Sequence, residues 1–319
     1  MKVLILGLGW YGCHAAVTLK RLNIPFKLLD ITNDFFTGSS SKNQNRLHQS
    51  FHYSRSASTR KECQIGFTRF MTTYPQFTQQ IPNNTYAIDK KSIIDFDTYK
   101  AIYSYEQVPF TSLETPNLPF DINKDMFEGF IKVEERYIDF RKARQYFTEE
   151  LSQHLLTYDP SKFDRLNTSY DNVKYNYIID CTFTPVPNTV KEQCISFLYK
   201  YTGPTTPLFA LTVMDGPFWS LYPYDIENNI FTLTDVVYTP LGVETNRYDL
   251  ETKIKNYIPD FNKLFTYQGN FTSNKIKPDN TNTDDRSLIY QLENNIFTFR
   301  GGKLTGMFTM EDILMQHFQ

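Results

Sequence analysis

Residues 2–30, KVLILGLGWYGCHAAVTLKRLNIPFKLLD, contain the pattern that decides the fold. The apolar run KVLIL leads into the glycine turn GLGWYG at 7–12, which opens a segment with helical spacing. A second apolar run, FKLLD, then ends at Asp30. Strand, glycine turn, helix, strand and acid, with the acid about twenty residues beyond the glycines, form the dinucleotide-binding fingerprint. The sequence therefore predicts an α/β fold with a Rossmann-like domain.

The residue types of this turn suit a dinucleotide. Gly7 permits a tight turn, Gly9 lets the backbone approach a pyrophosphate, and Gly12 lets the helix pack closely on the strand. The helix N-terminus offers free N–H groups and a partial positive charge to the phosphates. We expect Asp30 to accept hydrogen bonds from ribose hydroxyls and to repel a 2′-phosphate, which disfavours NADP. The alternative is a glycine-containing turn in another kind of α/β protein.

Composition narrows the class of protein. The 319 residues are enough for two domains. A net charge of −2 argues against nucleic acid or an anionic membrane as the main partner and leaves a small-molecule substrate. The apolar runs are too short to span a bilayer. The scattered cysteines form no CxxC pair, which argues against a zinc site and a disulfide framework and favours a reducing, cytoplasmic location. They are Cys13, Cys63, Cys181 and Cys194.

Residues 34–53, DFFTGSSSKNQNRLHQSFHY, are polar without a helical apolar stripe or strand alternation. They resemble the segment after the second strand in FAD-dependent glycerol-3-phosphate dehydrogenases. More loosely, they resemble the wider family of D-amino-acid-oxidase-like flavoproteins. The matching residues are Asp34, Phe35, Thr37, Gly38, Ser39, Ser40, Ser41, Lys42, Leu47, His48 and Tyr53.

The C-terminal stretch 296–314, IFTFRGGKLTGMFTMEDIL, resembles the same family, in which a strand leads into Gly-Gly-Lys-Leu-Thr and a helix. Upstream, Arg286 lies in a segment similar to the family's Arg-Pro-Leu, with Ser287 in place of proline. Residues 175–185 resemble the strand that re-enters the FAD domain, with Phe183 in place of a glycine. The C-terminal matches are Gly301, Gly302, Lys303, Leu304, Thr305, Met310 and Glu311.

The two stretches together imply FAD as the cofactor. A flavin uses one anion-binding turn for its pyrophosphate and a second one where negative charge gathers on reduction. The glycine turn at 301–305 opens a helix, whose N–H groups and dipole suit the second task. An NAD-dependent dehydrogenase needs no C-terminal element of this kind.

The resemblance implies a discontinuous FAD-binding domain and a second, α+β substrate domain on a mostly antiparallel sheet. We place residues 1–80, 131–190 and 285–319 in the FAD-binding domain and residues 81–130 and 191–284 in the substrate domain.

Several local elements are predicted from periodicity. We expect strands at TYAI and KSIIDF and further antiparallel strands between 195 and 240. Residues 134–155 read as an amphipathic surface helix with a solvated charge run. Residues 249–265 read as one helix, and residues 277–285 as a polar loop.

The expected cofactor-binding residues come from both ends of the chain. Ser40 and Ser41 are expected to bond the phosphates, or to cap a helix to the same end. Arg46 and Lys42 either contact flavin or phosphate or are solvated surface charges. The full set is Gly7, Gly9, Gly12, Asp30, Ser40, Ser41, Arg46, Gly301, Gly302, Lys303, Leu304 and Thr305.

The candidate catalytic residues are His48 and Arg286. His48 matches the family histidine beside the flavin, where it orients the ring or contacts substrate; the alternative is a structural histidine. The resemblance implies that Arg286 holds the anionic group of the substrate, because a guanidinium offers a bidentate fork. The alternative is an ion pair with a nearby acid. His48 and His52 lie four apart without a third ligand at suitable spacing, so we expect no metal site.

The sequence therefore predicts an FAD-dependent oxidoreductase. It would oxidise a C–N or C–O bond of a small, polar, anionic substrate by hydride transfer to flavin N5. Three alternatives stay open: an NAD-dependent dehydrogenase, a flavin-dependent sugar-nucleotide isomerase or mutase, and a non-catalytic dinucleotide-binding module.

Overall fold

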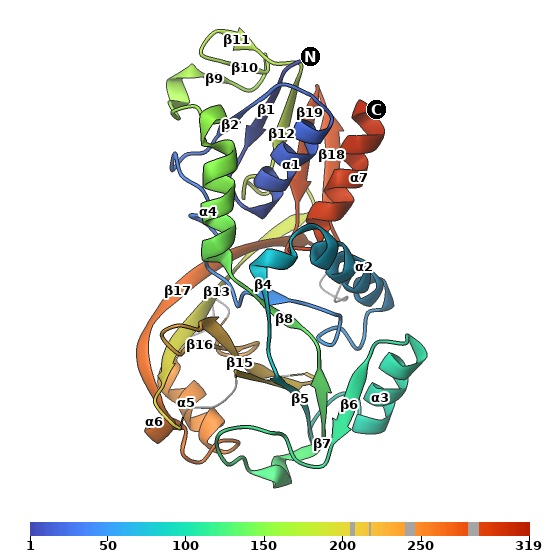
Figure 1. The fold of residues 1–319 in the computed structure, drawn as a ribbon, viewed down its shortest axis with the longest axis vertical. Coiled ribbons are helices and arrows are strands. Elements are labelled where there is room, and N and C mark those ends of the chain that lie inside the picture. Colours follow the sequence, from blue (N-terminus) through green and yellow to red (C-terminus); the bar gives the residue numbers. More distant parts are fainter. Residues whose placement is uncertain (205–207, 217, 240–245, 280–286) are drawn as a thin grey trace.

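The computed structural model describes residues 1–204, 208–216, 218–239, 246–279 and 287–319 and is built around two large sheets (Figure 1). The five-stranded sheet has the order β18-β19-β12-β1-β2. Its strands are β1 (Val3–Leu6), β2 (Phe26–Leu29), β12 (Tyr177–Asp180), β18 (Ile289–Glu293) and β19 (Ile296–Arg300). The four strands from β2 to β19 run parallel, and β18 is antiparallel to β19.

Layers on both faces bury the five-stranded sheet. All four residues of β1 are buried apolar residues, as expected for a central parallel strand. Helices cover one face: α1 (Trp10–Arg21), α4 (Phe140–Leu151) and α7 (Gly306–Phe318), with α2 (Ala57–Thr73) against α7 (Figure 1). The other face packs against a small sheet made of β9 (Phe163–Asp164), β10 (Ser169–Tyr170) and β11 (Val173–Lys174).

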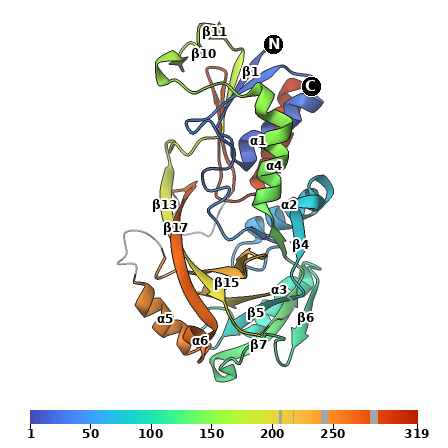
Figure 2. The ribbon, with the colours of Figure 1, turned by 60° about the vertical axis from the view of Figure 1, so that its left-hand side comes forward.

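The eight-stranded sheet has the order β17-β13-β16-β15-β14-β5-β7-β6. Only β14 and β5 pair in parallel among its described strand pairs. Figure 2 shows β13 and β17 as long neighbouring strands that reach from this sheet toward the other half of the molecule. The strands are β5 (Asn83–Asp89), β6 (Phe110–Leu113), β7 (Phe127–Val133), β13 (Thr189–Tyr201), β14 (Phe209–Met214), β15 (Trp219–Asp225), β16 (Ile230–Asp235) and β17 (Phe265–Pro278).

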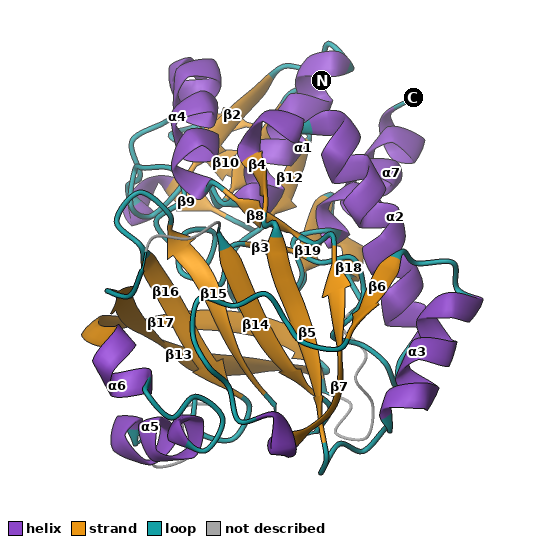
Figure 3. Cartoon of the chain, turned by 60° about the horizontal axis from the view of Figure 1, so that its bottom comes forward, coloured by secondary structure: helices purple, strands orange, loops and turns teal. Residues whose placement is uncertain are grey.

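Helices also flank the eight-stranded sheet. Helices α5 (Arg247–Lys255) and α6 (Phe261–Leu264) pack on one face, and α3 (Phe96–Tyr105) lies beside β5 and β7 (Figure 3). A three-stranded sheet of β3 (Arg46–Leu47), β8 (Arg136–Ile138) and β4 (Thr78–Gln80) lies between the two large sheets (Figure 1). This arrangement confirms the predicted fold class, while the exact domain boundaries stay a prediction. Short 3₁₀ turns are η1 (Pro75–Phe77), η2 (Lys124–Met126), η3 (Ser152–His154) and η4 (Pro160–Lys162).

Three local predictions were wrong. KSIIDF is a turn, because the Asp95 carboxylate accepts a hydrogen bond from the Thr98 N–H and starts α3. The expected helix at 134–155 begins only at Phe140, and strand β8 precedes it. The single helix expected at 249–265 is two helices, since Pro259 interrupts the helical hydrogen bonding between α5 and α6. Most of the expected polar loop at 277–285 lies outside the described residues.

No helix among the described residues is both long enough and apolar enough to cross a membrane.

A network of polar side chains around His14 joins α1, α2 and α7. His14 is fully buried and lies 2.7 Å from the Tyr74 hydroxyl and 3.1 Å from the Glu311 carboxylate. Because a carboxylate only accepts, Nε2 of His14 donates to Glu311 and Nδ1 accepts from Tyr74. Glu311 also pairs with Arg21 and with Arg69. Burial, assisted by the two arginines, lowers the pKa of His14 from 6.5 to about 3.

This network predicts a pH-dependent loss of stability. Between about pH 6.5 and pH 3 the unfolded imidazole binds a proton that the folded one does not, so the free energy of unfolding falls as pH falls. The slope from His14 approaches about 1.4 kcal/mol per pH unit. We expect denaturant titrations to show wild type losing stability relative to His14→Gln between about pH 7 and pH 5. An equal stability difference at both pH values would contradict the assignment.

Candidate active site

The glycine turn after β1 forms the predicted fingerprint geometry. Gly7 has φ +91°, and a Cβ on Gly12 would lie only 1.8 Å from the Gly7 carbonyl oxygen, so both positions require glycine. Ser40 Oγ accepts a hydrogen bond from the Trp10 N–H at 3.0 Å and so sits at the start of α1. A Cβ on Gly9 would lie 2.5 Å from that same oxygen. The loop that carries Ser39, Ser40 and Ser41, called the serine loop below, therefore lies directly over the fingerprint.

Asp30 lies at the carboxyl end of β2, beside this turn. One carboxylate oxygen accepts from the Leu8 N–H at 2.9 Å, and the other accepts from the Thr32 N–H at 2.9 Å and hydroxyl at 2.6 Å. These bonds fix the carboxylate where a ribose is expected. The ribose contact itself stays a prediction.

Serine side chains attach the serine loop to β17 and hold its own turn. Ser39 Oγ donates to the Asn274 carbonyl in β17 at 2.7 Å, and Ser41 Oγ donates to the Gly38 carbonyl at 3.1 Å. Lys42 is exposed. The loop thus connects the fingerprint to the eight-stranded sheet, with Ser40 nearest to the expected phosphate position.

The C-terminal turn at 301–305 docks on α1 through Tyr11, a contact that sequence analysis missed. The Tyr11 hydroxyl donates to the Lys303 carbonyl at 2.6 Å. A Cβ on Gly301 or Gly306 would lie 2.4 or 2.3 Å from that hydroxyl oxygen. The two turns expected to hold the flavin therefore touch each other. Lys303 is buried, with Nζ 4.3 Å from the centre of the Tyr53 ring.

The other residues of this turn differ in exposure, and their contact with the cofactor stays a prediction. Gly302 is exposed, Leu304 is half-buried and Thr305 is buried at the start of α7. Arg286, the predicted substrate ligand, lies outside the described residues.

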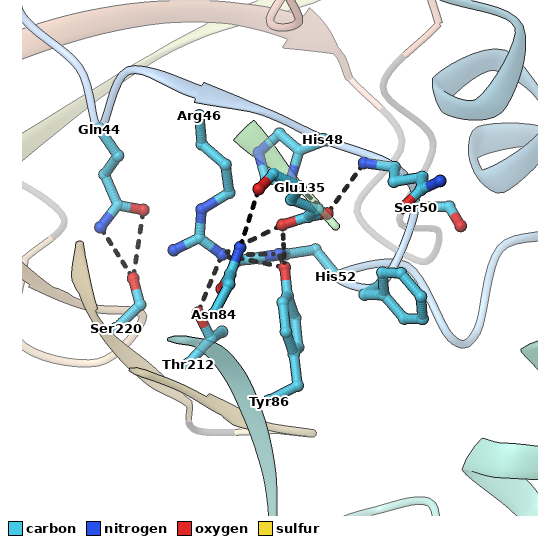
Figure 4. Close-up of polar contacts among 12 residues, drawn as sticks. Gln44, Arg46, His48, Ser50, His52, Asn84, Tyr86, Glu135, Thr212 and Ser220 are labelled. Atoms are coloured by element: carbon cyan, nitrogen blue, oxygen red, sulfur yellow. Dashed lines mark hydrogen bonds and ion pairs between the residues drawn. The ribbon is translucent and has the colours of Figure 1, made fainter. Parts of the chain in front are cut away.

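Beyond the serine loop, the chain carries Arg46 onto one face of the eight-stranded sheet (Figure 4). The Arg46 side chain is 1% exposed. Its Nη1 donates to the Tyr86 hydroxyl and to Thr212 Oγ1, each at 2.9 Å, and its guanidinium lies 3.9 Å from the centre of the Tyr222 ring. Within the described chain, Nε and Nη2 are buried without a hydrogen-bond partner. Arg46 is therefore no surface charge.

Glu135, between β7 and β8, is the buried counter-charge. Its Oε2 accepts from the Tyr86 hydroxyl at 2.6 Å, and its Oε1 accepts from the Gln49 N–H at 2.9 Å (Figure 4). It lies 3.8 Å from Arg46 Nη1 and 3.7 Å from His48 Nδ1. Burial opposes its charged form, but His48, Arg46 and Tyr86 together hold the pKa of Glu135 below its usual value. Sequence analysis wrongly placed Glu135 in a solvated charge run.

The two histidines of this region are neutral at neutral pH. Burial lowers the pKa of His48, although Glu135 works against that shift. Burial and then Arg46 lower the pKa of His52 well below its usual value. His52 Nδ1 lies 2.5 Å from the Tyr86 hydroxyl. We call Arg46, His48, His52, Tyr86, Glu135 and Thr212 the buried polar cluster.

The structure brings a third candidate metal ligand to the two histidines, which their spacing in sequence did not reveal. Candidate ligand atoms of His48, His52 and Glu135 lie within 4.8 Å of one another, because β8 brings Glu135 close from a distant part of the sequence. Arg46 Nη1 lies 3.2 Å from His52 and 3.8 Å from Glu135. A cation there would meet this fixed positive charge at close range. The absence of a metal stays a prediction.

Comparison with known proteins finds curated relatives and solved structures of similar fold. The FAD-dependent monooxygenase FPY4 of Fusarium mangiferae is 32% identical over 331 aligned positions, which cover 95% of this chain and 87% of the relative. The chain belongs to the FAD-dependent oxidoreductases. No family model matches it.

Solved structures show the fold. Glycine oxidase from Geobacillus kaustophilus superposes with a TM-score of 0.74 at 10% identity, over 99% of this chain and 93% of that one. L-α-glycerophosphate oxidase from Mycoplasma pneumoniae, with FAD bound, gives a TM-score of 0.73 at 14% identity, over 99% and 94%. This oxidoreductase therefore has the D-amino-acid-oxidase-like fold, and its cofactor is FAD rather than NAD.

The residues present fit that cofactor. A Cβ on Gly9 would clash with Ser40 Oγ, and the N-terminus of α1 lies beside Gly9. The turn that carries the buried Lys303 contacts α1 through Tyr11. We expect the Gly7–Gly12 turn, Asp30, Ser40 and Ser41 to hold the dinucleotide part. We expect the 301–305 turn to face the ring.

Gly9→Val should abolish FAD retention. The branched side chain would take the place of the pyrophosphate and also clash with Ser40 Oγ. The ratio of flavin absorbance to protein after desalting measures this. The matched control is Gly38→Ala, whose new Cβ would meet only the Phe183 ring at 3.6 Å and should keep FAD. Stoichiometric FAD in Gly9→Val would disprove the placement.

Proposed function

We propose that this enzyme oxidises a C–N or C–O bond of a small, polar, anionic substrate, with hydride transfer to flavin N5. The supporting observation is that Nε and Nη2 of the buried Arg46 guanidinium have no hydrogen-bond partner within the described chain. Bound FAD supplies the hydride acceptor. The protein's own residues then have to bind the anion, orient the reacting C–H bond and accept a proton.

The Arg46 edge suits an anion for geometric and energetic reasons. Nε–H and Nη2–H point in parallel from one edge of the planar group and form a fork that matches a carboxylate or phosphate. Leaving buried donors of a charged group unbonded is costly. The hydroxyl of Tyr222, whose ring the guanidinium covers, is also buried without a partner in the described chain, and we propose it as a third donor to the anion.

Arg46 thus serves the substrate in this proposal, rather than the FAD contact expected from sequence. Its hydrogen bonds run to β5 and β14 of the eight-stranded sheet, not to the glycine turn. The predicted role of Arg286 as a substrate ligand stays a prediction, because Arg286 lies outside the described residues.

His48 is the proposed proton acceptor. Its ring is neutral near neutral pH, and its side chain is 26% exposed, whereas Arg46 and Glu135 are buried. As the substrate carbon gives up a hydride, its amine or hydroxyl group must lose a proton for the C=N or C=O bond to form. A neutral imidazole within the site can accept that proton.

Monooxygenation is a second candidate, because the 32% identical relative is named an FAD-dependent monooxygenase. The two reactions differ in what they need. Substrate alone reduces the flavin in the proposed oxidation, whereas a monooxygenase inserts an oxygen atom from O₂ into its product. Anaerobic mixing with substrate therefore separates them, and flavin reduction there also argues against an isomerase or a non-catalytic module.

We expect an anionic member of a panel of amino acids, hydroxy acids and polyol phosphates to bleach the flavin anaerobically. Arg46→Gln should raise the apparent dissociation constant of that substrate roughly 10- to 100-fold, because a charged hydrogen-bonding fork is lost. Arg46→Lys should restore only part of the affinity, because an ammonium keeps the charge without the fork.

Lys42→Gln is the matched control, since this exposed residue of the same segment should leave affinity unchanged. FAD content must be equal in all variants. Unchanged affinity in Arg46→Gln, or bleaching by uncharged substrates alone, would refute the anion site.

A further inference from the structure

We propose that Glu135 is a positioning residue that orients His48 so that its Nε2 accepts the substrate proton. This inference rests on the proposed function, and it concerns a residue whose position in sequence gives no hint of such a role. It follows from three features of the buried polar cluster: the direction in which His48 faces Glu135, the way Glu135 is held, and the charges around His48.

The first feature is the orientation of the imidazole. Nδ1 is the ring nitrogen that faces Glu135, at 3.7 Å from Oε1. It is shielded from solvent and has no hydrogen-bond partner in the described chain, although the whole side chain is 26% exposed. The accessible part of the ring therefore lies away from Glu135. A small approach of the two groups would make Nδ1–H···Oε1 a hydrogen bond.

The second feature is the rigidity of Glu135. The Gln49 N–H holds Oε1 at 2.9 Å, and the Tyr86 hydroxyl holds Oε2 at 2.6 Å. Asn84 Nδ2 donates to the Glu135 carbonyl at 3.2 Å. The carboxylate is thus fixed in a fully buried position with one face toward His48. Since a carboxylate only accepts, it selects the neutral tautomer that carries hydrogen on Nδ1 and leaves the Nε2 lone pair free.

The third feature is the set of charges around His48. Arg46 in β3 and Lys303 before α7 both disfavour a second proton on the ring. His52, whose ring centre is 4.6 Å away, is neutral, and the Tyr53 ring centre lies 5.9 Å away. Glu135 is the carboxylate among the described groups that favours the proton. Without it, His48 would be a much weaker base between two cations.

The step balances as follows. The substrate carbon loses a hydride to the oxidised flavin, and its N–H or O–H proton passes to His48 Nε2, so that a C=N or C=O bond forms. The ring then carries a positive charge, which the Nδ1–H···Oε1 contact with Glu135 stabilises. Glu135 itself touches neither substrate nor cofactor in this account, and it keeps its charge throughout.

Proton NMR of ¹⁵N-histidine-labelled, FAD-loaded protein tests the pairing without any substrate. The chain has five histidines, and loss of one signal in His48→Gln assigns His48. In Glu135→Gln we expect the pKa of His48 to fall by about one to two units, because an opposite charge within about 4 Å is removed. The ¹⁵N shifts should also show loss of the Nδ1–H tautomer. The matched control is Glu134→Gln, an exposed neighbour that should change neither property.

The second measurement is the pH profile of anaerobic flavin reduction. In wild type the rate should rise with pH as His48 loses its proton. In Glu135→Gln this acid limb should move to lower pH by the amount seen by NMR, and the plateau rate should fall roughly tenfold or more. Substrate affinity should change little, since Arg46 is untouched.

Other outcomes separate the claims. An unchanged His48 pKa in Glu135→Gln, or an acid limb that does not follow it, overturns the role of Glu135. A shifted pKa without flavin reduction by any anionic substrate supports the pairing but overturns the proposed function. If Glu135→Gln loses FAD or fails to fold, Glu135→Asp keeps the charge on a shorter side chain. In Glu135→Asp, a fall in the His48 pKa that is smaller than the fall expected for Glu135→Gln supports the role. No change in the His48 pKa overturns it.

Discussion

The burial of the opposite charges of Arg46 and Glu135 on one face of the eight-stranded sheet is the constraint on which the site depends. Two charges removed from water are stable only when hydrogen bonds and their mutual attraction replace hydration. The Tyr86 hydroxyl stabilises both charges, because it donates a hydrogen bond to Glu135 and accepts one from Arg46. Yet the pairing leaves one edge of Arg46 without a partner in the described chain. That remaining edge, inside an otherwise satisfied cluster, is what suggests an anionic ligand.

The chain connects this cluster to the fingerprint turn. One continuous segment runs from the serine loop over the fingerprint, through β3, to the histidines, so the residues proposed to bind flavin and substrate lie on a single stretch of backbone. Tyr11 attaches the C-terminal turn to α1 on the other side. Strand β8 pairs with β3, and this pairing brings Glu135, the residue before β8, close to the segment with the histidines. Residues from four distant parts of the chain thus converge between the two sheets.

The sequence predicts the parts of this structure whose signals are local. The fingerprint glycines, Asp30 and the 301–305 turn could be recognised because each needs a particular backbone geometry at a fixed spacing. Glu135 could not, because the surrounding charge pattern is typical of a solvated helix and only strand pairing with β3 turns the residue inward. Tyr86 and Tyr222 are two of 22 tyrosines, and nothing in their immediate sequence distinguishes them. Long-range packing, not local periodicity, brings these residues together.

The proposed function requires that the unpaired edge of Arg46 and the accessible side of His48 face the same substrate. A crystal structure of the FAD-loaded protein with a non-oxidisable carboxylate analogue tests it most directly. The account predicts the carboxylate on Nε and Nη2 of Arg46, with the analogue's amine or hydroxyl group within hydrogen-bond distance of His48 Nε2. An analogue bound elsewhere, with the Arg46 edge covered by the protein itself, would contradict it.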